Sequence, residues 1–268
     1  MKIATWNINS VRLRIDQVVQ FAERESPDII CLQEIKCRND QFPEKALRAA
    51  GYEHQAVSGQ TGYHGVAIVS RIAFKNPTTE WFCGKEDCRH VAVDVHGGVR
   101  IHNFYIPAGG DVPDPEENEK FAHKLQFLEE LAEMFKSPQA AKKKQILVGD
   151  LNVAPREHDV WSHKQLLKVV SHTPAEVELL NAAMAAGKWV DVAREIAPEP
   201  EKLYSWWSYR AKDWRASNRG RRLDHIWVTP PLAKAATALG RTGFKIHEDC
   251  RDWERPSDHA PVTMTLDL

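Results

Sequence analysis

Short hydrophobic runs that end in polar residues recur from one end of the chain to the other. They have the length and the β-branched composition of strands. These runs lie at residues 2–9, 28–34, 65–70, 90–95, 99–106, 145–152, 222–228 and 261–268. The clearest helical patterns lie between them, at residues 14–25, 117–136 and 174–187. This mixture predicts a layered α/β protein, in which sheets pack on each other or are covered by helices.

The even spread of strands favours a single domain over residues 1–268. The chain of 268 residues is long enough to bury a substantial core, and no break in composition divides it. Residues 109–118 are expected to form an acidic surface loop. Pro174 suits the first turn of the last predicted helix, and Gly187 is expected to form its C-terminal cap.

The sequence favours a soluble protein of the cytoplasm. No apolar run approaches the roughly 20 residues of a membrane helix, and residues 1–10 lack the pattern of a secretory signal. Five cysteines form no C-x-x-C pair, so neither a zinc site nor a disulfide framework is indicated. We expect reduced thiols.

A local cluster of cations stands out against a formal net charge of -1. Residues 210–222 contain one acid, Asp213. The cations in the same stretch are Arg210, Lys212, Arg215, Arg219, Arg221 and Arg222. Aromatic residues are interleaved with them, namely Trp206, Trp207, Tyr209 and Trp214. A solvated loop is the alternative interpretation. Aromatics beside cations favour a surface for phosphates and bases.

The strand ends carry a particular set of polar residues. In the stretch "GDLN", Asp150 and Asn152 are two residues apart, so an extended backbone would point both to the same side. A turn would explain this pair taken alone. The other strand ends, however, supply Asn7, Asn9, Glu34, Asn103, Tyr105, Asp224, Asp258 and His259. Carboxylates, amides, a phenol and an imidazole are the groups that hydrolysis of a phosphodiester requires.

Each of these groups suits one part of that chemistry. Charge on the phosphate oxygens must be neutralised, and Mg²⁺ held by Glu34 with help from Asn7 would do this. Asp150 could deprotonate the attacking water. Asn152, Asn7 and Tyr105 could stabilise the crowded phosphorus centre.

His259 could donate to the phosphate when protonated, and a carboxylate partner such as Asp224 would raise its pKa. Structural alternatives remain open for single residues. Asn7 could cap a helix, Tyr105 could be a strand aromatic, and Asp224 could pair with Arg222.

The motifs that hold these residues resemble one family. They are "WNINSVRLR" from Trp6, "PDIICLQEIK" from Pro27, "GYHGVAIVS" from Gly62, "NFYIPAGG" from Asn103, "GDLNVAP" from Gly149, "SNRGRRLDHIWV" from Ser217 and "SDHAPV" from Ser257. The chain resembles the divalent-metal phosphodiesterases that include exonuclease III, apurinic/apyrimidinic endonucleases, pancreatic-type deoxyribonucleases, inositol polyphosphate phosphatases and neutral sphingomyelinases. "LQEIK", "NFYIP" and "NRGRRLD" narrow the resemblance to the DNA-repair branch.

The resemblance implies a four-layered α/β sandwich of the DNase I-like type, in which two mixed β-sheets pack face to face with helices outside. It implies catalytic roles for Tyr105, Asp150, Asn152, Asp224 and His259. It implies a metal site formed from Asn7, Glu34, Asp150, Asn152, Asp258 and His259. Mg²⁺ would be the cofactor, with Mn²⁺ as a possible substitute.

The implied activity is that of a DNA-repair nuclease, acting as a 3′–5′ exodeoxyribonuclease on double-stranded DNA and as an apurinic/apyrimidinic endonuclease. The implied partner is double-stranded DNA with 3′ ends or abasic sites, bound by a monomer. The expected DNA contacts are Lys36, Trp206, Trp207, Arg210, Lys212, Arg215, Arg219 and Arg221.

Two positions depart from the family pattern. Arg221 stands where relatives carry an apolar residue that lines a sugar pocket, and Ala108 stands where an amide is common. Two alternatives remain. One is a phosphodiesterase or phosphatase of the same superfamily with a non-DNA substrate, and the other is a catalytically inactive DNA-binding homologue.

Overall fold

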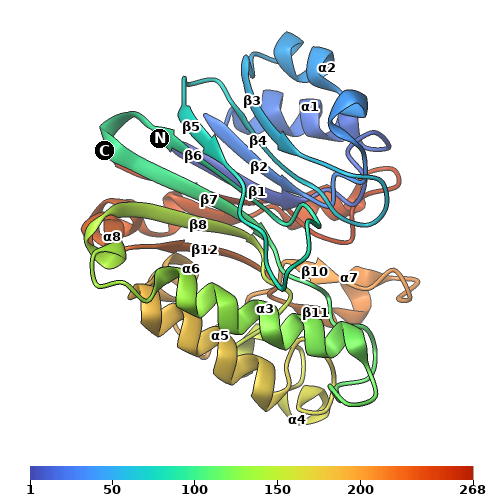
Figure 1. Ribbon diagram of the computed structural model, residues 1–268. Coiled ribbons are helices and arrows are strands. Elements are labelled where there is room, and N and C mark those ends of the chain that lie inside the picture. Colours follow the sequence, from blue (N-terminus) through green and yellow to red (C-terminus); the bar gives the residue numbers. More distant parts are fainter. Residues whose placement is uncertain (268) are drawn as a thin grey trace.

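Two six-stranded mixed sheets pack face to face, with helices on both outer sides (Figure 1). The structure is a computed structural model, and it describes residues 1–267. In Figure 1, α1 and α2 cover one sheet, and α3 and α5 cover the other. The predicted four-layered α/β sandwich is confirmed.

The first sheet has the strand order β13-β14-β1-β2-β4-β3. Its strands are β1 (Lys2–Asn7), β2 (Ile29–Gln33), β3 (His54–Ser58), β4 (Val66–Ser70), β13 (Phe244–Ile246) and β14 (Val262–Thr265). The outer helices of this side are α1 (Ile15–Glu25) and α2 (Glu44–Ala49). Strands β1 and β14 come from opposite ends of the chain and pair antiparallel.

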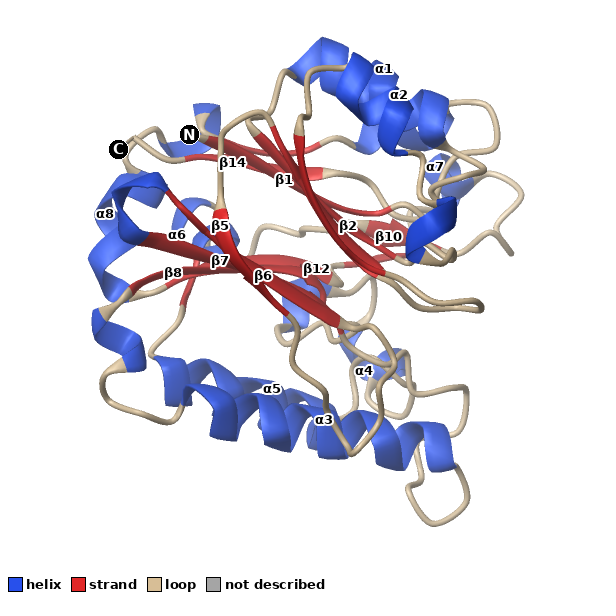
Figure 2. Cartoon of the chain, turned by 45° about the horizontal axis from the view of Figure 1, so that its top comes forward, coloured by secondary structure: helices blue, strands red, loops and turns tan. Residues whose placement is uncertain are grey.

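The second sheet has the order β5-β6-β7-β8-β12-β9. Its strands are β5 (Lys75–Thr78), β6 (His90–Val95), β7 (Val99–Tyr105), β8 (Lys144–Asp150), β9 (Val190–Asp191) and β12 (Asp224–Val228). The long helices α3 (Glu119–Phe135) and α5 (Pro174–Gly187) pack against each other on its outer face (Figure 2).

Short elements complete the fold. A two-stranded ribbon consists of β10 (Trp206–Trp207) and β11 (Gly220–Arg221). The remaining helices are α4 (His163–Leu166), α6 (Val192–Ile196), α7 (Trp214–Ser217) and α8 (Pro230–Thr237). Among residues 1–267, no helix is long and apolar enough to cross a membrane. The cysteines are free thiols, as predicted.

Alternation along the strands creates the layers, because successive side chains point to opposite faces of a sheet. In β8, Ile146 and Val148 belong to the core between the two sheets. Leu147 points the other way and packs with the side chains beneath α3 and α5. Both faces of the central strands are therefore buried, which explains their nearly continuous hydrophobic runs in the sequence.

All the strands and helices predicted from the sequence are present, with ends that differ by a few residues. Residue 268, the end of the last predicted strand, lies outside the described residues. The predictions missed the short edge strands β3, β5, β9 and β13 and the ribbon of β10 and β11; β5 is fully exposed. They also missed the shorter helices, which are α2, α4, α6, α7 and α8. Residues 109–118 form a largely exposed loop, as expected.

The predicted cap of α5 was wrong in detail. Lys188, with a φ of 51°, takes the left-handed position after the helix, and Gly187 is the last helical residue. A side chain at Gly187 would lie 2.1 Å from Nε1 of Trp189. Glycine is needed there because of close packing, since its backbone φ is not in the left-handed region.

Asn103 joins the two sheets and does not belong to the polar groups at the strand ends. Its Nδ2 donates to the carbonyls of Leu32 at 3.0 Å and Ala67 at 2.9 Å, which lie on the opposite sheet. Its Oδ1 accepts a hydrogen bond from Gln33 at 2.6 Å. The expectation that Asn103 offers its side chain to the site is therefore wrong, because both ends of its amide are used inside the core.

Arg222 is also buried, although the sequence placed it in the exposed cation cluster. It donates to Asp159 through Nε at 2.7 Å and Nη2 at 2.8 Å, and to Asp191 at 2.8 Å. Arg194 binds the same Asp159 carboxylate. Burial disfavours the ionised carboxyl, but Arg222 and Arg194 outweigh it and lower the pKa of Asp159 to about 2.

This network predicts a specific loss of stability in acid. The folded-state pKa of Asp159 lies below its ordinary value of 3.8, so its contribution is present above pH 4 and is lost as the pH falls towards 2. The shift corresponds to about 2 kcal/mol. Asp159→Asn should lower the free energy of unfolding at pH 7 by about 3–5 kcal/mol, because two buried guanidinium groups lose their partner.

Urea unfolding between pH 2 and pH 7 measures both effects. The difference between Asp159→Asn and the parent protein should shrink towards pH 2. Asp40→Asn, which breaks an exposed ion pair with Arg38, serves as the control and should change little. Equal losses in the two variants would contradict the assignment.

Candidate functional site

Strand ends from both sheets meet at one place. Strands β7 and β8 run parallel, with Tyr105 opposite Asp150, and the antiparallel β12 brings Asp224 opposite Asp150 on the other side. In the other sheet, Asn7 ends β1 beside the end of β2, after which Glu34 follows. Nδ2 of Asn7 donates to Asp150 at 2.8 Å, so the ends of the two sheets touch.

Three side chains contact the carboxylate of Glu34. Its Oε1 accepts hydrogen bonds from Nδ2 of Asn7 and from the hydroxyl of Tyr105, each at 2.9 Å. Its Oε2 pairs with Nζ of Lys36 at 2.8 Å. Burial, with Glu34 and Asp150 close by, raises the pKa of Tyr105 well above its usual range, so the phenol remains a donor.

Unusual backbone conformations mark the same region. Glu34 has a φ of 49° and Asn152 a φ of 53°, and Asn9 and Lys36 lie nearby in the same left-handed region. Residues other than glycine adopt this conformation at a cost of about 1 kcal/mol or more, and the surrounding structure must enforce it. In these conformations the side chain of Glu34 contacts Asn7, and the side chain of Asn152 contacts Asp150.

Asp150 is the buried centre of the cluster. Its Oδ2 accepts from Nδ2 of Asn7 and, at 3.1 Å, from Nδ2 of Asn152. Its Oδ1 accepts from the Asn152 backbone N–H at 3.0 Å. Burial raises the pKa of Asp150 to about 7, against the attraction of the neighbouring His259. A carboxyl group with a pKa near neutrality can take up and release a proton at physiological pH.

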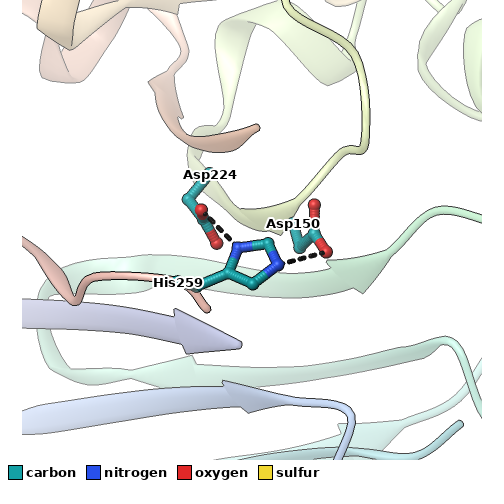
Figure 3. Close-up of side chains that lie close together, drawn as sticks. All are labelled: Asp150, Asp224 and His259. Carbon is teal, nitrogen blue, oxygen red and sulfur yellow. Dashed lines mark hydrogen bonds and ion pairs between the residues drawn. The ribbon is translucent and has the colours of Figure 1, made fainter. Parts of the chain in front are cut away.

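His259 lies between two carboxylates (Figure 3). Its Nδ1 is 2.8 Å from Asp224, and its Nε2 is 3.7 Å from Asp150. Burial opposes a charge on the ring, but Asp224 and Asp150 outweigh it and raise the pKa of His259 to about 10. These carboxylates therefore favour the imidazolium form of the ring near neutral pH, in which both nitrogens carry protons.

These charges decide which groups could hold a metal. Asp150, Asp224 and His259 lie close enough together to surround one ion. An imidazolium has no free lone pair, however, so this trio is better described as a charged imidazolium that is hydrogen-bonded to Asp224 and ion-paired with Asp150. The carboxylate of Glu34 fits a hard divalent cation and already attracts the ammonium of Lys36. Asn7 faces Glu34 with Nδ2, and its Oδ1 accepts the backbone N–H of Asn9 at 3.1 Å, so the amide would have to turn to offer its oxygen to the same ion.

Asp258 belongs to the next layer of contacts. Its oxygens accept hydrogen bonds from Nδ2 of Asn9 at 3.0 Å and from Nε1 of Trp206 at 2.9 Å. Burial would raise its pKa, but the charge of His259 outweighs this and lowers it. Both oxygens hold donors, which favours a hydrogen-bonding role over the predicted metal role.

The predicted nucleic-acid contacts divide into two groups. Arg210, Lys212, Arg215 and Arg219 are exposed on and around α7, and Trp206 and Arg221 are half-buried beside the site. Lys36 is bound to Glu34 and to Oδ1 of Asn9. The predicted DNA contact of Trp207 is wrong. This residue is 1% exposed and packs between Tyr204 and Trp214, so its ring cannot stack on a base.

The sequence did not reveal two supporting residues. Ser205 donates to Oδ2 of Asp224 at 2.6 Å, and its own oxygen accepts the Asp224 backbone N–H. Arg89 donates to the Tyr105 carbonyl at 3.3 Å, and its guanidinium lies 5.0 Å from the centre of the Tyr105 ring. Neither residue sits in a strand-end motif, so only the tertiary contacts identify them.

Comparisons with known proteins agree with this geometry. Residues 4–259 match the Endonuclease/Exonuclease/phosphatase family. Exodeoxyribonuclease III of Haemophilus influenzae is 30% identical, over 98% of both chains. A solved AP endonuclease from Archaeoglobus fulgidus has a TM-score of 0.90 and 32% identity, over the whole of both chains. A Neisseria structure described as 3′ phosphatase NExo bound to a product DNA hairpin has a TM-score of 0.89 and 33% identity, also over both whole chains.

The charge on His259 can be tested without any substrate. Its folded-state pKa of about 10 lies above the ordinary 6.5, so its contribution to stability is complete below pH 6.5 and is lost as the pH rises through 10. In the metal-free protein, ¹⁵N NMR of the imidazole should show both nitrogens protonated from pH 6 to pH 9. Asp224→Asn should lower this pKa by removing the nearer countercharge.

His225 is the internal control for this measurement. It is buried beside Arg222, and burial with that charge lowers its pKa to about 4. Its ring should remain neutral over the range in which His259 is charged. A neutral His259 ring at pH 7 would overturn this assignment of charge.

Proposed function

The chain belongs to the endonuclease/exonuclease/phosphatase family, and we propose that it is a magnesium-dependent hydrolase of DNA repair. It removes nucleotides from the 3′ ends of double-stranded DNA and cleaves the backbone beside abasic sites, leaving a 3′-hydroxyl. The observation that carries this proposal is the connected series of contacts in which Asn7 donates hydrogen bonds to Glu34 and Asp150, and Asp150 forms an ion pair with His259.

Glu34, with Asn7, holds Mg²⁺ in this proposal. The ion supplies Lewis-acid stabilisation of the negative charge that develops on the phosphate oxygens. The all-oxygen donor set supports a hard cation, and Mn²⁺ fits the same ligands. The ammonium of Lys36 lies against the same carboxylate, and also against Oδ1 of Asn9.

Asp150 accepts the proton of the attacking water. Its pKa of about 7 supports this role, because the carboxylate form is present at neutral pH and its basicity exceeds that of an ordinary aspartate. The Nδ2 group of Asn152 donates both to Asp150 and to the Ile106 carbonyl at 2.9 Å, which fixes the direction of the carboxylate. Asn152 thus positions the base.

His259 donates from Nε2 to a non-bridging oxygen of the scissile phosphate, while Asp224 holds Nδ1 and keeps the ring charged. The hydroxyl of Tyr105 supplies a second donor. Both donors stabilise charge that builds up in the transition state, and such contacts contribute about 3–4 kcal/mol each in comparable sites. Asp258 completes the hydrogen-bonding layer around them.

The substrate assignment relies on the exposed basic surface and on the relatives. Arg210, Lys212, Arg215 and Arg219 are exposed in the segment that follows Trp206 in the chain, and exposed cations suit a phosphate backbone. Arg215 also pairs with Asp252. We also propose that residues 1–268 form one catalytic domain, which the pairing of β1 with β14 supports. We propose that it acts as a monomer in the cytoplasm, and its free cysteines fit a reducing compartment.

A non-DNA phosphodiester and an inactive DNA-binding role are the competing hypotheses. Turnover measured side by side on abasic duplex, blunt duplex, 3′-phosphorylated duplex and a soluble phosphodiester separates them. The 3′-phosphorylated duplex is included because one of the relatives is described as a 3′ phosphatase.

Replacing the general base is the most direct test. Asp150→Asn should lower kcat by about 10²–10⁴-fold, because the proton acceptor is lost, while the Kd for duplex DNA changes little. Rates from a labelled duplex and affinities from fluorescence anisotropy measure the two effects, with the melting temperature as a check on folding. Asp111→Asn, in the exposed acidic loop, is the control and should behave as the parent. Unchanged turnover in Asp150→Asn would refute the role of Asp150.

Metal dependence is tested on a labelled duplex with one internal abasic analogue. EDTA should abolish cleavage, because the charge on the phosphate oxygens is then not neutralised, and added Mg²⁺ or Mn²⁺ should restore it. A time course of the products gives the ratio of exonuclease to abasic-site cleavage. Cleavage that persists in EDTA would exclude the metal from the mechanism.

A further inference from the structure

Arg221 places an incompletely bonded guanidinium beside the site. On β11, Arg221 pairs with Trp206 of β10, and Trp206 forms a bridge with His259 on its other side. Neighbouring strands are about 4.8 Å apart, so the backbones of Arg221 and His259 are separated by roughly 10 Å. The guanidinium lies over the Trp206 ring, 5.2 Å from its centre.

One side of this guanidinium is fixed by the protein. Its Nη1 donates to the Val170 carbonyl at 2.9 Å and to Oγ of Ser171 at 2.7 Å. Ser171 has a φ of 87°, and its backbone N–H is held by Glu176 at 2.9 Å. The loop before α5 therefore fixes the direction of the Arg221 guanidinium.

The other side has no partner within the described chain. The Nε–H of Arg221 is buried and donates to no acceptor among residues 1–267, and no hydrogen bond from Nη2 occurs in that range. Nε and Nη2 form the edge through which arginine binds phosphate or carboxylate with two parallel hydrogen bonds. A buried donor without an acceptor destabilises the protein, and the cost is greater when the donor is charged.

The nearest acid is already committed elsewhere. Glu176 accepts hydrogen bonds from the backbone N–H groups of Ser171 and Thr173 and from the Thr173 hydroxyl, and it forms a buried ion pair with Lys124. Lys124 in turn donates to the Asn152 carbonyl at 2.7 Å. Glu176 therefore cannot supply the second acceptor that the Arg221 edge requires.

We propose that the Nε–Nη2 edge of Arg221 binds a phosphate of the nucleic-acid strand that flanks the phosphate being cleaved. This inference rests on the proposed function and adds a second phosphate-binding position to it. A strand rises by about 3.4 Å per nucleotide, so the flanking phosphate lies within about three nucleotides of the scissile bond. Arg221 would then fix the register of the strand at the catalytic centre.

A scan with uncharged linkages locates this phosphate. Duplexes carry a single methylphosphonate at each of the three positions on either side of the cleavage point, and kcat/KM is measured for the parent protein, Arg221→Leu, Arg221→Lys and Arg100→Leu. At one position the parent should lose about ten- to a hundredfold, the size of a charge-assisted bidentate contact. Arg221→Leu should lose little further at that position, because its contact is already missing.

The control variants separate this contact from general effects of charge. Arg100 lies near the start of β7, roughly 17 Å along the strand from Tyr105, so Arg100→Leu should keep the parent pattern. Arg221→Lys keeps the charge but loses the two-pronged edge, and it should show an intermediate loss. Equal sensitivity of the parent and Arg221→Leu at every position would overturn the proposal. Faster cleavage by Arg221→Leu beside an abasic residue would also overturn it, because Arg221 would then be an obstacle.

A measurement without turnover keeps this inference separate from the proposed function. In ¹⁵N NMR spectra, the Nε–H signal of Arg221, assigned by its absence in Arg221→Leu, should shift on titration with inorganic phosphate. A shift in a protein that cleaves no DNA would support the phosphate site while the proposed function fails. Cleavage of DNA with no phosphate-dependent shift and no position-specific loss would leave the proposed function intact and exclude Arg221 as a phosphate ligand.

Discussion

The contact between Asn7 and Asp150 joins the two halves of the molecule at the site. Asn7 ends a strand of one sheet and Asp150 ends a strand of the other, and one amide group donates to both Glu34 and Asp150. The contact requires the two sheets to pack with their strand ends level. The Asn103 bridge, just inside the core, holds the sheets in that alignment through hydrogen bonds that cross between them.

Burial and countercharge together give the site its chemical character. Asp150 is nearly inaccessible and its pKa rises towards 7, whereas His259 gains a proton because two carboxylates surround it. Both pKa values rise, but for different reasons: burial makes Asp150 a stronger base, and the neighbouring carboxylates keep His259 a charged donor. Ser205 and Arg89 are not part of this acid–base pair, but their hydrogen bonds hold Asp224 and Tyr105 in place.

Much of the fold could be predicted from the sequence because its signals are local. The hydrophobic runs predicted the long strands, and the helical patterns predicted α1, α3 and α5. The shortest strands escaped prediction, since β5 buries none of its side chains and its residues carry no periodic pattern. The site residues at the strand ends were likewise visible, because polar side chains after apolar runs are informative whatever the partner strands are.

The sequence by itself determined the layered α/β architecture, the polar strand ends and the family motifs, because each depends on residues that are close together in the chain. Only the tertiary structure decided which polar residues meet. Arg222 and Trp207 looked like surface residues within a basic and aromatic stretch, yet both are buried. The Arg222 partners Asp159 and Asp191 come from other segments, as does Ala260, which packs with Trp207. Long-range pairing sets the burial and the countercharge of every group, and these in turn set its chemistry.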